Sequence, residues 1–333
     1  MVECPAFSAN FKERVSTKDP AVTRLVVTQG DPEGIGPELL LRLGEAGALA
    51  GGDRVVADLG GLDALARALA TPWATRGLDA LRPLLVDVPG GQVAALARGV
   101  DLVLEDPAGT ALVTAPIDKA RCRAEGFTFP GHTEYLAARA GTDDFAMLMV
   151  GPVLRVVPVT IHVPLRTVPD LLSSAAIVRA GRLLGHALHH LFGIAAPRLG
   201  VLGLNPHAGE KGMLGDEEGR VIAPAVDELR AWAARAGEPC TFVGPLAADS
   251  AFALHAAGGL DGLLAMYHDQ GLGPFKLLHM RDGVNMTLGL PFVRTSPDHG
   301  TARDIAGRGV ADPRSFFTAV AYARGRIPGE GTR

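Results

Sequence analysis

The chain has 333 residues, of which 47% are hydrophobic and 20% are charged. This length allows a large apolar core and predicts about two domains. The net charge of −4, from 32 basic and 36 acidic residues, argues against a nucleic-acid partner, because such proteins normally present a basic face. The sequence has no apolar stretch of the ~18–20 residues that cross a bilayer, so no membrane partner is expected.

Cysteine use and the first residues bear on the cellular compartment. Cys4, Cys122 and Cys240 are far apart and odd in number, so they form neither a disulfide framework nor a metal-binding spacing. A cytoplasmic protein is therefore expected, since thiols stay reduced there. Residues 1–22 lack the apolar core of a signal peptide and are predicted to be an extension before the first strand.

Short β-rich runs alternate with helical patterns along the chain. A strand is expected at 23–30 and a helix at 37–50, and similar runs alternate through residues 54–115. Residues 145–163 predict two strands joined at Gly151-Pro152, and residues 175–192 have the apolar spacing of a long helix. Strands are then expected at 198–205, 262–267 and 285–296, and helices at 224–237 and 313–325. This alternation predicts an α/β protein with a largely parallel sheet.

Several well-known motifs are absent. The glycine-rich stretches 34–39 and 271–276 both lack the third glycine of the G-x-G-x-x-G fingerprint. There is also no Walker A sequence, no H-E-x-x-H, no G-x-S-x-G and no EF-hand loop. A standard Rossmann dehydrogenase, a P-loop NTPase and an α/β-hydrolase are therefore disfavoured.

Three β-rich runs end close to a histidine. His162 lies in "VTIHVPLR", His207 in "LNPHAGEKG" and His268 in "MYHDQG". A single histidine at a strand end is usually a hydrogen-bonded structural residue, but three such ends indicate a catalytic metal site with an open coordination position. Asp269 is either a turn residue or a group that supports this site.

Other polar groups leave two interpretations open. "GDPEGIGPE" (30–38) is either an anion-binding loop at a helix N-terminus or a tight turn. In "FPGHTEYLA" (129–137), Thr133 could cap a helix and His132 could face a ligand or solvent. Lys276, Asn285 and Arg294 follow one another at intervals of nine residues and could clamp a phosphate or carboxylate, or be solvated. The histidines of the predicted long helix are interpreted as partly exposed structural residues: His186, His189 and His190.

Taken together, these blocks resemble the 4-hydroxythreonine-4-phosphate dehydrogenase family of vitamin B6 biosynthesis. The resemblance covers roughly residues 23–325. The shared blocks occur in the family's order: "GDPEGIGPE", "TAPIDK", "FPGHTE", "IHVPLR", "LNPHAGE", "GPLAAD", "AMYHDQG" and "GVNMTLGLPFVRTSPDHGTA". Two positions depart from the common pattern, Ile161 where threonine is frequent and Asp118 where asparagine is frequent.

The resemblance implies roles for individual residues. The metal ligands would be His162, His207 and His268, with zinc, magnesium, cobalt or manganese as the ion. The residues that would bind substrate are His132, Thr133, Lys276, Asn285 and Arg294. Asp249 and Lys276 would act in catalysis, Asp249 as a proton acceptor. NAD or NADP would be the oxidant, and the resemblance assigns no residues to the cofactor.

The resemblance also implies an architecture, namely the two-domain fold of isopropylmalate and isocitrate dehydrogenases with an active-site cleft between the domains. The first domain would comprise 23–130 and 286–333. The second, 131–285, would carry most of the metal site and the contacts of a homodimer whose active sites are shared between subunits.

The implied reaction is oxidation of 4-phosphooxy-L-threonine to a 2-amino-3-oxo acid, which decarboxylates to 3-amino-2-oxopropyl phosphate. Related enzymes of the family act on other substrates, so D-threonate 4-phosphate is an alternative, whereas the "GHTE" block argues against a cyclic dihydrodiol. A metal-dependent phosphatase or lyase would use the same residue types without NAD. A non-catalytic sensor would need a broken histidine triad, and here the triad is complete.

Overall fold

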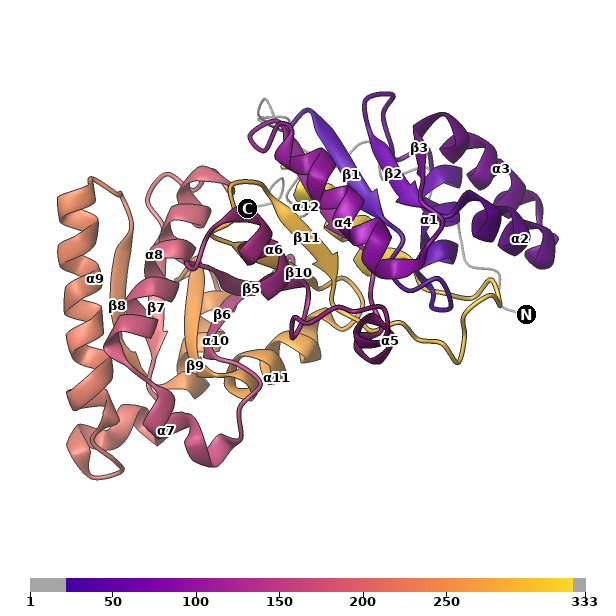
Figure 1. Ribbon diagram of the computed structural model, residues 1–333. Helices are drawn as coiled ribbons and strands as arrows, with labels where there is room; N and C mark the ends of the chain where they lie inside the picture. The colour runs from indigo at the N-terminus through magenta and orange to yellow at the C-terminus, as the bar shows by residue number, and fades with distance from the viewer. Residues whose placement is uncertain (1–21, 326–333) are drawn as a thin grey trace. The chain divides into compact units, whose positions relative to one another are not determined.

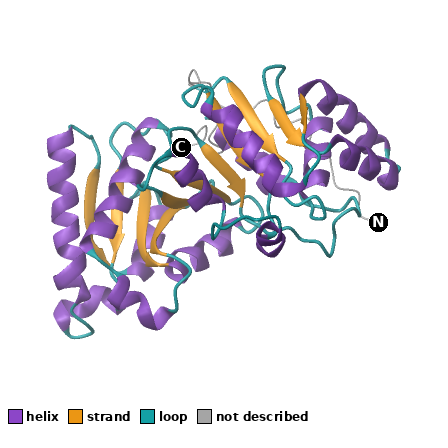
Figure 2. Cartoon of the chain, viewed as in Figure 1, coloured by secondary structure: helices purple, strands orange, loops and turns teal. Residues whose placement is uncertain are grey.

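The computed structural model describes residues 22–325, so the predicted extension lies almost wholly outside the described residues (Figure 1). The chain forms two compact units. The first contains the described residues up to Gly141 and those from Leu290 onward, and the second is Thr142–Gly289. The sequence interpretation placed the domain divisions earlier, after residues 130 and 285. Strands and helices alternate in both units (Figure 2).

The strands of the first unit are parallel and follow the order β3-β2-β1-β4-β11. Their bounds are β1 Arg24–Thr28, β2 Arg54–Ala57, β3 Leu85–Asp87, β4 Thr110–Thr114 and β11 Arg294–Pro297. β1 and β4 are almost wholly buried, because helices cover a parallel sheet and leave its central strands no contact with water.

Helices connect the strands of the first unit. Their bounds are α1 Gly36–Glu45, α2 Leu59–Leu69, α3 Pro72–Leu81, α4 Gly91–Leu104, α5 Lys119–Ala124, α6 His132–Ala140 and α12 Arg314–Ala323. α4 packs on β1, β2 and β4, and α12 packs on β4 and β11 (Figure 1). Between α4 and the sheet lies a core that includes Val26, Leu96, Val100 and Leu112. α1 packs closely on α3, because Gly44 and Gly77 have no side chains to hold the two helices apart.

The strands of the second unit follow the order β10-β5-β6-β9-β7-β8. Their bounds are β5 Ala146–Val150, β6 Arg155–Thr160, β7 Arg198–Leu202, β8 Thr241–Leu246, β9 Gly262–Tyr267 and β10 Val284–Leu288. β6, β9, β7 and β8 are parallel, whereas β5 is antiparallel to both β6 and β10. β5 and β6 form the pair of joined strands predicted at 145–163.

The helices of the second unit are α7 Val168–Leu171, α8 Ser174–His190, α9 Ala223–Ala236, α10 Ala248–Ala256 and α11 His268–His279. α8 and α11 both pack on β6 and β9, and α9 packs on α8 and β8 (Figure 1). Ser173 caps α8 by accepting a hydrogen bond from the Ala176 amide, as expected for serine at this position. Within residues 22–325, none of the helices is long and apolar enough to cross a membrane.

The α/β class predicted from the sequence is confirmed, and the strand predicted at 262–267 has those bounds in the structure. The single strand expected at 285–296 was wrong. The segment instead forms β10 and β11, which belong to different units and pair with β5 and β4 respectively. Gly289 has a left-handed φ of 89° at this break. A Cβ there would lie 1.9 Å from the Asp144 carbonyl oxygen, so only glycine fits.

Candidate active site

The carboxyl ends of β6, β9 and β7 carry the three histidines predicted as metal ligands. These strands are parallel neighbours, so their carboxyl ends lie on one edge of the sheet. The rings of His162 and His268 lie with their centroids 5.7 Å apart. The exposed His207 ring contacts Glu210 in its own loop, with 3.4 Å between Nδ1 and Oε1. The structure thus pairs two of the histidines and places the third on the neighbouring loop.

Two of these histidines have an unusual backbone conformation. His162 has a φ of 51° and His207 a φ of 52°. Left-handed φ values continue from His207 through Lys211 and range from 44° to 77°. Non-glycine residues lose about 1–2 kcal/mol each in this conformation, and such backbone is concentrated at functional sites. The conformations therefore favour a functional loop over a turn that is merely polar.

Glu218 holds the start of the loop that carries His207. It is almost fully buried at the beginning of the short helix Glu218–Ile222, which leads into α9. Its Oε1 accepts hydrogen bonds from the amides of Leu204 (2.8 Å) and Asn205 (2.7 Å), and its Oε2 accepts one from the Asn205 side chain (3.1 Å). Hydrogen bonds to a charged group contribute ~1.5–3 kcal/mol each, enough to offset much of the backbone strain. The sequence analysis missed this residue.

Gln270 ties the strand ends together. Its Oε1 accepts a hydrogen bond from the Met266 amide (2.6 Å), and its Nε2 donates to the Gly203 carbonyl after β7 (2.7 Å). Thr160 at the end of β6 donates to the Met266 carbonyl (2.8 Å). The ends of β6, β7 and β9 are therefore fixed relative to one another. The sequence interpretation gave Gln270 no role, although its position in the "MYHDQG" block close to His268 could have indicated one.

Asp269 orients the imidazole of His268. Its Oδ1 lies 2.7 Å from His268 Nδ1, while the side chain is otherwise 87% exposed. A hydrogen bond at Nδ1 places the proton there and leaves Nε2 with its lone pair available to a ligand. This arrangement is typical of histidines that bind metals.

A separate basic group lies in the first unit, around the N-terminus of α6. Arg294 at the start of β11 is 2% exposed and donates a hydrogen bond from its guanidinium to the Thr114 hydroxyl (2.7 Å). His132 begins α6, and its Nε2 is buried without a hydrogen-bond partner among residues 22–325. Lys119 begins α5, and its Nζ lies 3.9 Å from where a Cβ on Gly131 would be. The positive charges of Arg294 and Lys119, together with the unpaired ring nitrogen of His132, suit this place to an anion.

Lys119 was not assigned a role from the sequence, although it ends the "TAPIDK" block. The structure places it beside the N-terminus of α6. Thr133 was considered as the helix cap, and this was wrong. The N-cap is Gly131, which has no side chain that could cap the helix, and α6 already begins at His132. Thr133 is instead half-buried in the first turn of α6, next to His132.

Burial, and then the charges of Arg294 and Lys119, hold the pKa of His132 well below its usual value of 6.5. The unfolded chain takes up a proton near pH 6.5 and the folded chain does not, so the contribution of this group to stability is present above pH 6.5 and is lost below it. We expect a His132→Gln variant to lose less stability than the parent protein between pH 7 and pH 5, by up to about 1.4 kcal/mol per pH unit. Urea unfolding at the two pH values measures this difference, and equal losses in both proteins would contradict it.

The remaining predicted residues lie in the second unit. Lys276 is half-buried on α11, and Asn285 lies on β10 with its side-chain oxygen buried and unpaired among residues 22–325. Asp249 is exposed in the first turn of α10, where its Oδ1 accepts a hydrogen bond from the Ser250 amide (2.8 Å). Asn285 has a free acceptor for a polar ligand, and Asp249 has a solvent-accessible carboxylate.

The "GDPEGIGPE" block is a tight turn whose amides bind the protein itself. The amide of Glu33 donates to the Asp31 carboxylate, and the amide of Ile35 donates to the Thr301 carbonyl. The buried Asp31 carboxylate also accepts hydrogen bonds from Arg121 (3.1 Å) and Arg303 (2.8 Å). Of the two interpretations, the structure favours the turn, because these donors are already satisfied.

A cavity of about 270 Å³ lies beside this turn, at the carboxyl ends of β1 and β2. Its walls include Gln29, Asp58, Leu62 and Leu65. Gln29 is 2% exposed, and its Nε2 is buried without a hydrogen-bond partner among residues 22–325. Open α/β sheets bind ligands at the carboxyl ends of their strands. The cavity thus combines a free donor, a carboxylate and an apolar wall.

Comparisons with known proteins identify the family. Residues 90–323 match the family model described as pyridoxal phosphate biosynthetic protein PdxA. A 4-hydroxythreonine-4-phosphate dehydrogenase from Erythrobacter litoralis is 44% identical over 326 residues, covering 90% of this chain and 95% of that protein. The crystal structure of the enzyme of the same name from Klebsiella pneumoniae has a TM-score of 0.77 at 37% identity, covering 90% of this chain and 98% of that one.

A β-decarboxylating dehydrogenase from Thermococcus kodakarensis shares the fold at 14% identity, with a TM-score of 0.50 and coverage of 90% of this chain and 81% of that one. The predicted likeness to dehydrogenases of that fold is confirmed. The chain belongs to the PdxA family of 4-hydroxythreonine-4-phosphate dehydrogenases, as its sequence motifs predict.

Proposed function

We propose that the protein oxidises 4-phosphooxy-L-threonine with a nicotinamide cofactor, giving a 2-amino-3-oxo acid that loses CO2 to form 3-amino-2-oxopropyl phosphate. Family membership supports a dehydrogenase of pyridoxal phosphate biosynthesis. The observation that carries the proposal is the group of histidines at the ends of three adjacent parallel strands, two of them in strained backbone conformations. Strained backbone is concentrated at active sites, so this group of histidines favours an enzyme over a protein that only binds a ligand.

The histidine group suits a divalent metal ion. His162, His207 and His268 would hold it, and the hydrogen bond from His268 to Asp269 leaves Nε2 of that imidazole available. Three imidazoles favour zinc or cobalt over magnesium, which prefers oxygen ligands. When bound, the ion would supply Lewis-acid polarisation of the hydroxyl oxygen on the carbon that is oxidised.

The other residues bind and orient the substrate. Arg294 and Lys119 provide positive charge for the phosphate or carboxylate, and the neutral His132 provides an uncharged hydrogen-bonding group beside them. The free side-chain oxygen of Asn285 accepts a hydrogen bond from the substrate's amino or hydroxyl group. Asp249 takes the hydroxyl proton.

Lys276 would bind the anionic group of the substrate and would also act in catalysis. It lies on α11, the helix that His268 begins. A substrate held through its charged ends keeps the carbinol hydrogen directed at the nicotinamide, which lowers the entropic part of the barrier.

The cavity beside Gln29 and Asp58 is assigned to the adenosine half of the cofactor. The free Nε2 of Gln29 would donate to this part of the cofactor, and the apolar wall would contact the base. The Asp58 carboxylate at the end of β2 would accept from a ribose hydroxyl and repel a 2′-phosphate, which favours NAD over NADP. An Asp58→Asn variant should therefore discriminate less between the two cofactors.

One assay tests the main proposal. Purified protein is incubated with 4-phosphooxy-L-threonine or D-threonate 4-phosphate, with NAD or NADP, and with or without added zinc, cobalt, manganese or magnesium. We expect metal-dependent NADH formation with 4-phosphooxy-L-threonine. Turnover confined to D-threonate 4-phosphate would move the assignment to that substrate. Phosphate release without any need for NAD would instead identify a phosphatase or lyase.

Asp269→Asn tests how the metal group is supported. We expect the affinity for the metal to fall about tenfold, at the lower end of the 10–100-fold range for such partners, because Asp269 is largely exposed and water can replace it. Isothermal titration with zinc measures the change, and Asp282→Asn is the matched control. Asp282 makes the corresponding contact to the buried structural His279 (3.0 Å). An equal loss of affinity in both variants would contradict the assignment.

A homodimer is part of the proposal. The last turn of α11 and the residue after it carry exposed apolar side chains, with Leu277 84%, Leu278 52% and Met280 68% exposed. Such side chains on a helix are typical of a surface that a second subunit covers. Light scattering on purified protein measures the mass, and Leu277→Glu should shift a dimer toward the monomer.

A further inference from the structure

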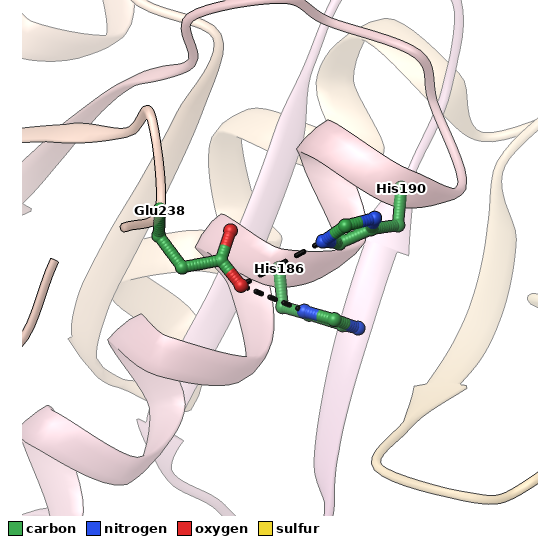
Figure 3. A group of neighbouring side chains, drawn as sticks. All are labelled: His186, His190 and Glu238. Atoms are coloured by element: carbon green, nitrogen blue, oxygen red, sulfur yellow. Dashed lines mark hydrogen bonds and ion pairs between the residues drawn. The ribbon is translucent and has the colours of Figure 1, made fainter. Parts of the chain in front are cut away.

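A second group of potential metal ligands lies away from the residues assigned to catalysis. His186 and His190 are one turn apart on α8, and Glu238 faces them from the connection between α9 and β8 (Figure 3). His186 Nδ1 lies 3.0 Å from Glu238 Oε1, and His190 Nε2 lies 3.6 Å from the same oxygen. One potential ligand atom from each residue lies within 4.8 Å of the other two.

The local fold holds the three side chains in place. α8 buries the face that carries Leu184 and Leu188, so His186 and His190 lie on its outer face. α9 ends at Gly237, whose left-handed φ of 68° turns the chain back toward α8. The amide of Glu238 then donates to the Ala233 carbonyl (3.0 Å), which completes the helix end. The main chain of Glu238 is therefore fixed to the end of α9.

Two of the three separations between the ligand atoms are close to those around a tetrahedral zinc ion. Zinc binds histidine and carboxylate at about 2.0–2.1 Å, so two ligand atoms of a tetrahedral ion lie about 3.3 Å apart. The two observed separations, 3.0 Å and 3.6 Å, bracket this value. Histidines four residues apart on a helix reach a common ion, as in the H-E-x-x-H motif. The third separation, between the two imidazoles, is at most 4.8 Å, so the rings would move closer together on binding.

The chemical state of the group also suits a cation. Glu238 contacts the imidazoles of both histidines through one carboxylate oxygen, Oε1. Its second oxygen is buried without a hydrogen-bond partner among residues 22–325 and is therefore available to a cation. The last turn of α8 adds the partial negative charge of a helix C-terminus.

Two neighbouring residues lie outside the group. Cys240 is only 5% exposed and does not belong to the set of residues whose ligand atoms lie within 4.8 Å of one another. His189 lies between the two ligand histidines in sequence, but its Nδ1 is 3.0 Å from the Ile194 carbonyl. The ligand set is therefore two imidazoles and one carboxylate, with a coordination position open to water.

We propose that His186, His190 and Glu238 bind one zinc ion in a site separate from the catalytic group. The ion ties the last turn of α8 to the connection between α9 and β8. Because it binds the folded chain and not the unfolded one, it raises the stability of the second unit without taking part in the reaction.

The test counts ions in the full-length protein. Metal-free protein is titrated with zinc near neutral pH, and bound zinc is measured by elemental analysis after gel filtration. The parent protein should hold two ions per chain. His186→Ala/His190→Ala should hold one, and the control His189→Ala should hold two. To separate the sites, His207→Ala/His268→Ala is measured as well. It should retain one ion, which the further loss of His186 and His190 removes.

Thermal unfolding gives a second readout. Excess zinc should raise the unfolding midpoint of the His207→Ala/His268→Ala protein by about 5 °C, and by less than about 1 °C once His186 and His190 are also replaced. Glu238→Gln keeps the side-chain shape and should weaken zinc binding at least tenfold. Equal zinc content and equal midpoints with and without His186 and His190 would overturn the proposal. Saturation reached only at millimolar zinc would also overturn it, since that behaviour marks an adventitious surface contact.

Discussion

Replacing His207 by alanine should lower kcat by about 10³-fold and leave the thermal unfolding midpoint unchanged. The kinetic effect follows from losing one of three ligands, since metal polarisation of a reacting oxygen is worth several kcal/mol and ~4 kcal/mol corresponds to about 10³-fold. The stability should not change because the His207 ring is 64% exposed and its contact is a long one to Glu210, which is itself 52% exposed. Steady-state NADH formation and differential scanning calorimetry measure the two quantities.

Two comparisons make this result specific. His189→Ala removes another partly exposed imidazole of the same unit and should leave kcat within about twofold. High zinc should partly restore the rate of His207→Ala, because the remaining His162 and His268 still offer two ligands. Full activity of His207→Ala in metal-free buffer would remove the basis for the catalytic metal group.

Arg294→Lys should raise KM for the phosphorylated substrate about 10²-fold, with a smaller effect on kcat. The guanidinium is 2% exposed and is fixed by its hydrogen bond to Thr114, so a lysine cannot reproduce its planar set of donors. Hydrogen bonds that involve a charged group contribute ~1.5–3 kcal/mol each, which gives the expected magnitude.

The charge itself adds a pH dependence. Burial lowers the pKa of Arg294 to about 10, so the arginine stays charged at neutral pH. Burial lowers the pKa of a lysine as well, and a lysine starts from a lower ordinary pKa than an arginine, so it would lose its charge at a lower pH. KM of the lysine variant should therefore rise further between pH 7 and pH 9, while KM of the parent protein changes little.

Arg155→Lys is the control for replacing a buried arginine. Arg155 is 8% exposed on β6, and its guanidinium lies 5.3 Å from the centre of the Phe192 ring. Its replacement should lower the free energy of unfolding and leave KM unchanged at every pH. If both variants raise KM equally, the effect on Arg294 reflects general disturbance of the fold and not substrate binding.

The sequence predicted the α/β class and the three histidine-bearing strand ends, because both depend on local patterns. A buried parallel strand such as "GLLAMY" is an apolar run with polar residues directly after it. Parallel neighbours bring their carboxyl ends to one edge, so a repeated pattern of a strand followed by histidine indicates a common site. The family motifs, which are local as well, then implied which histidines would bind the metal.

Contacts between distant parts of the chain were beyond this kind of inference. Periodicity showed that 285–296 is β-rich, but not that the chain leaves one unit for the other at Gly289. His132 was open to interpretation as a solvated residue, and only its burial near Arg294 explains why its imidazole stays neutral.

The proposed zinc site of His186, His190 and Glu238 also depends on contacts between distant parts of the chain. The helical spacing of His186 and His190 was visible in the sequence, and exposed structural residues were the natural interpretation. Glu238 joins them only because α9 packs on α8 and ends at Gly237, which turns the chain back toward the histidines. Local sequence patterns predicted most of the strands and helices and the polar side chains that follow them, since these depend on neighbouring residues. The tertiary structure alone decided which of those side chains meet, because packing brings together residues that no local pattern links.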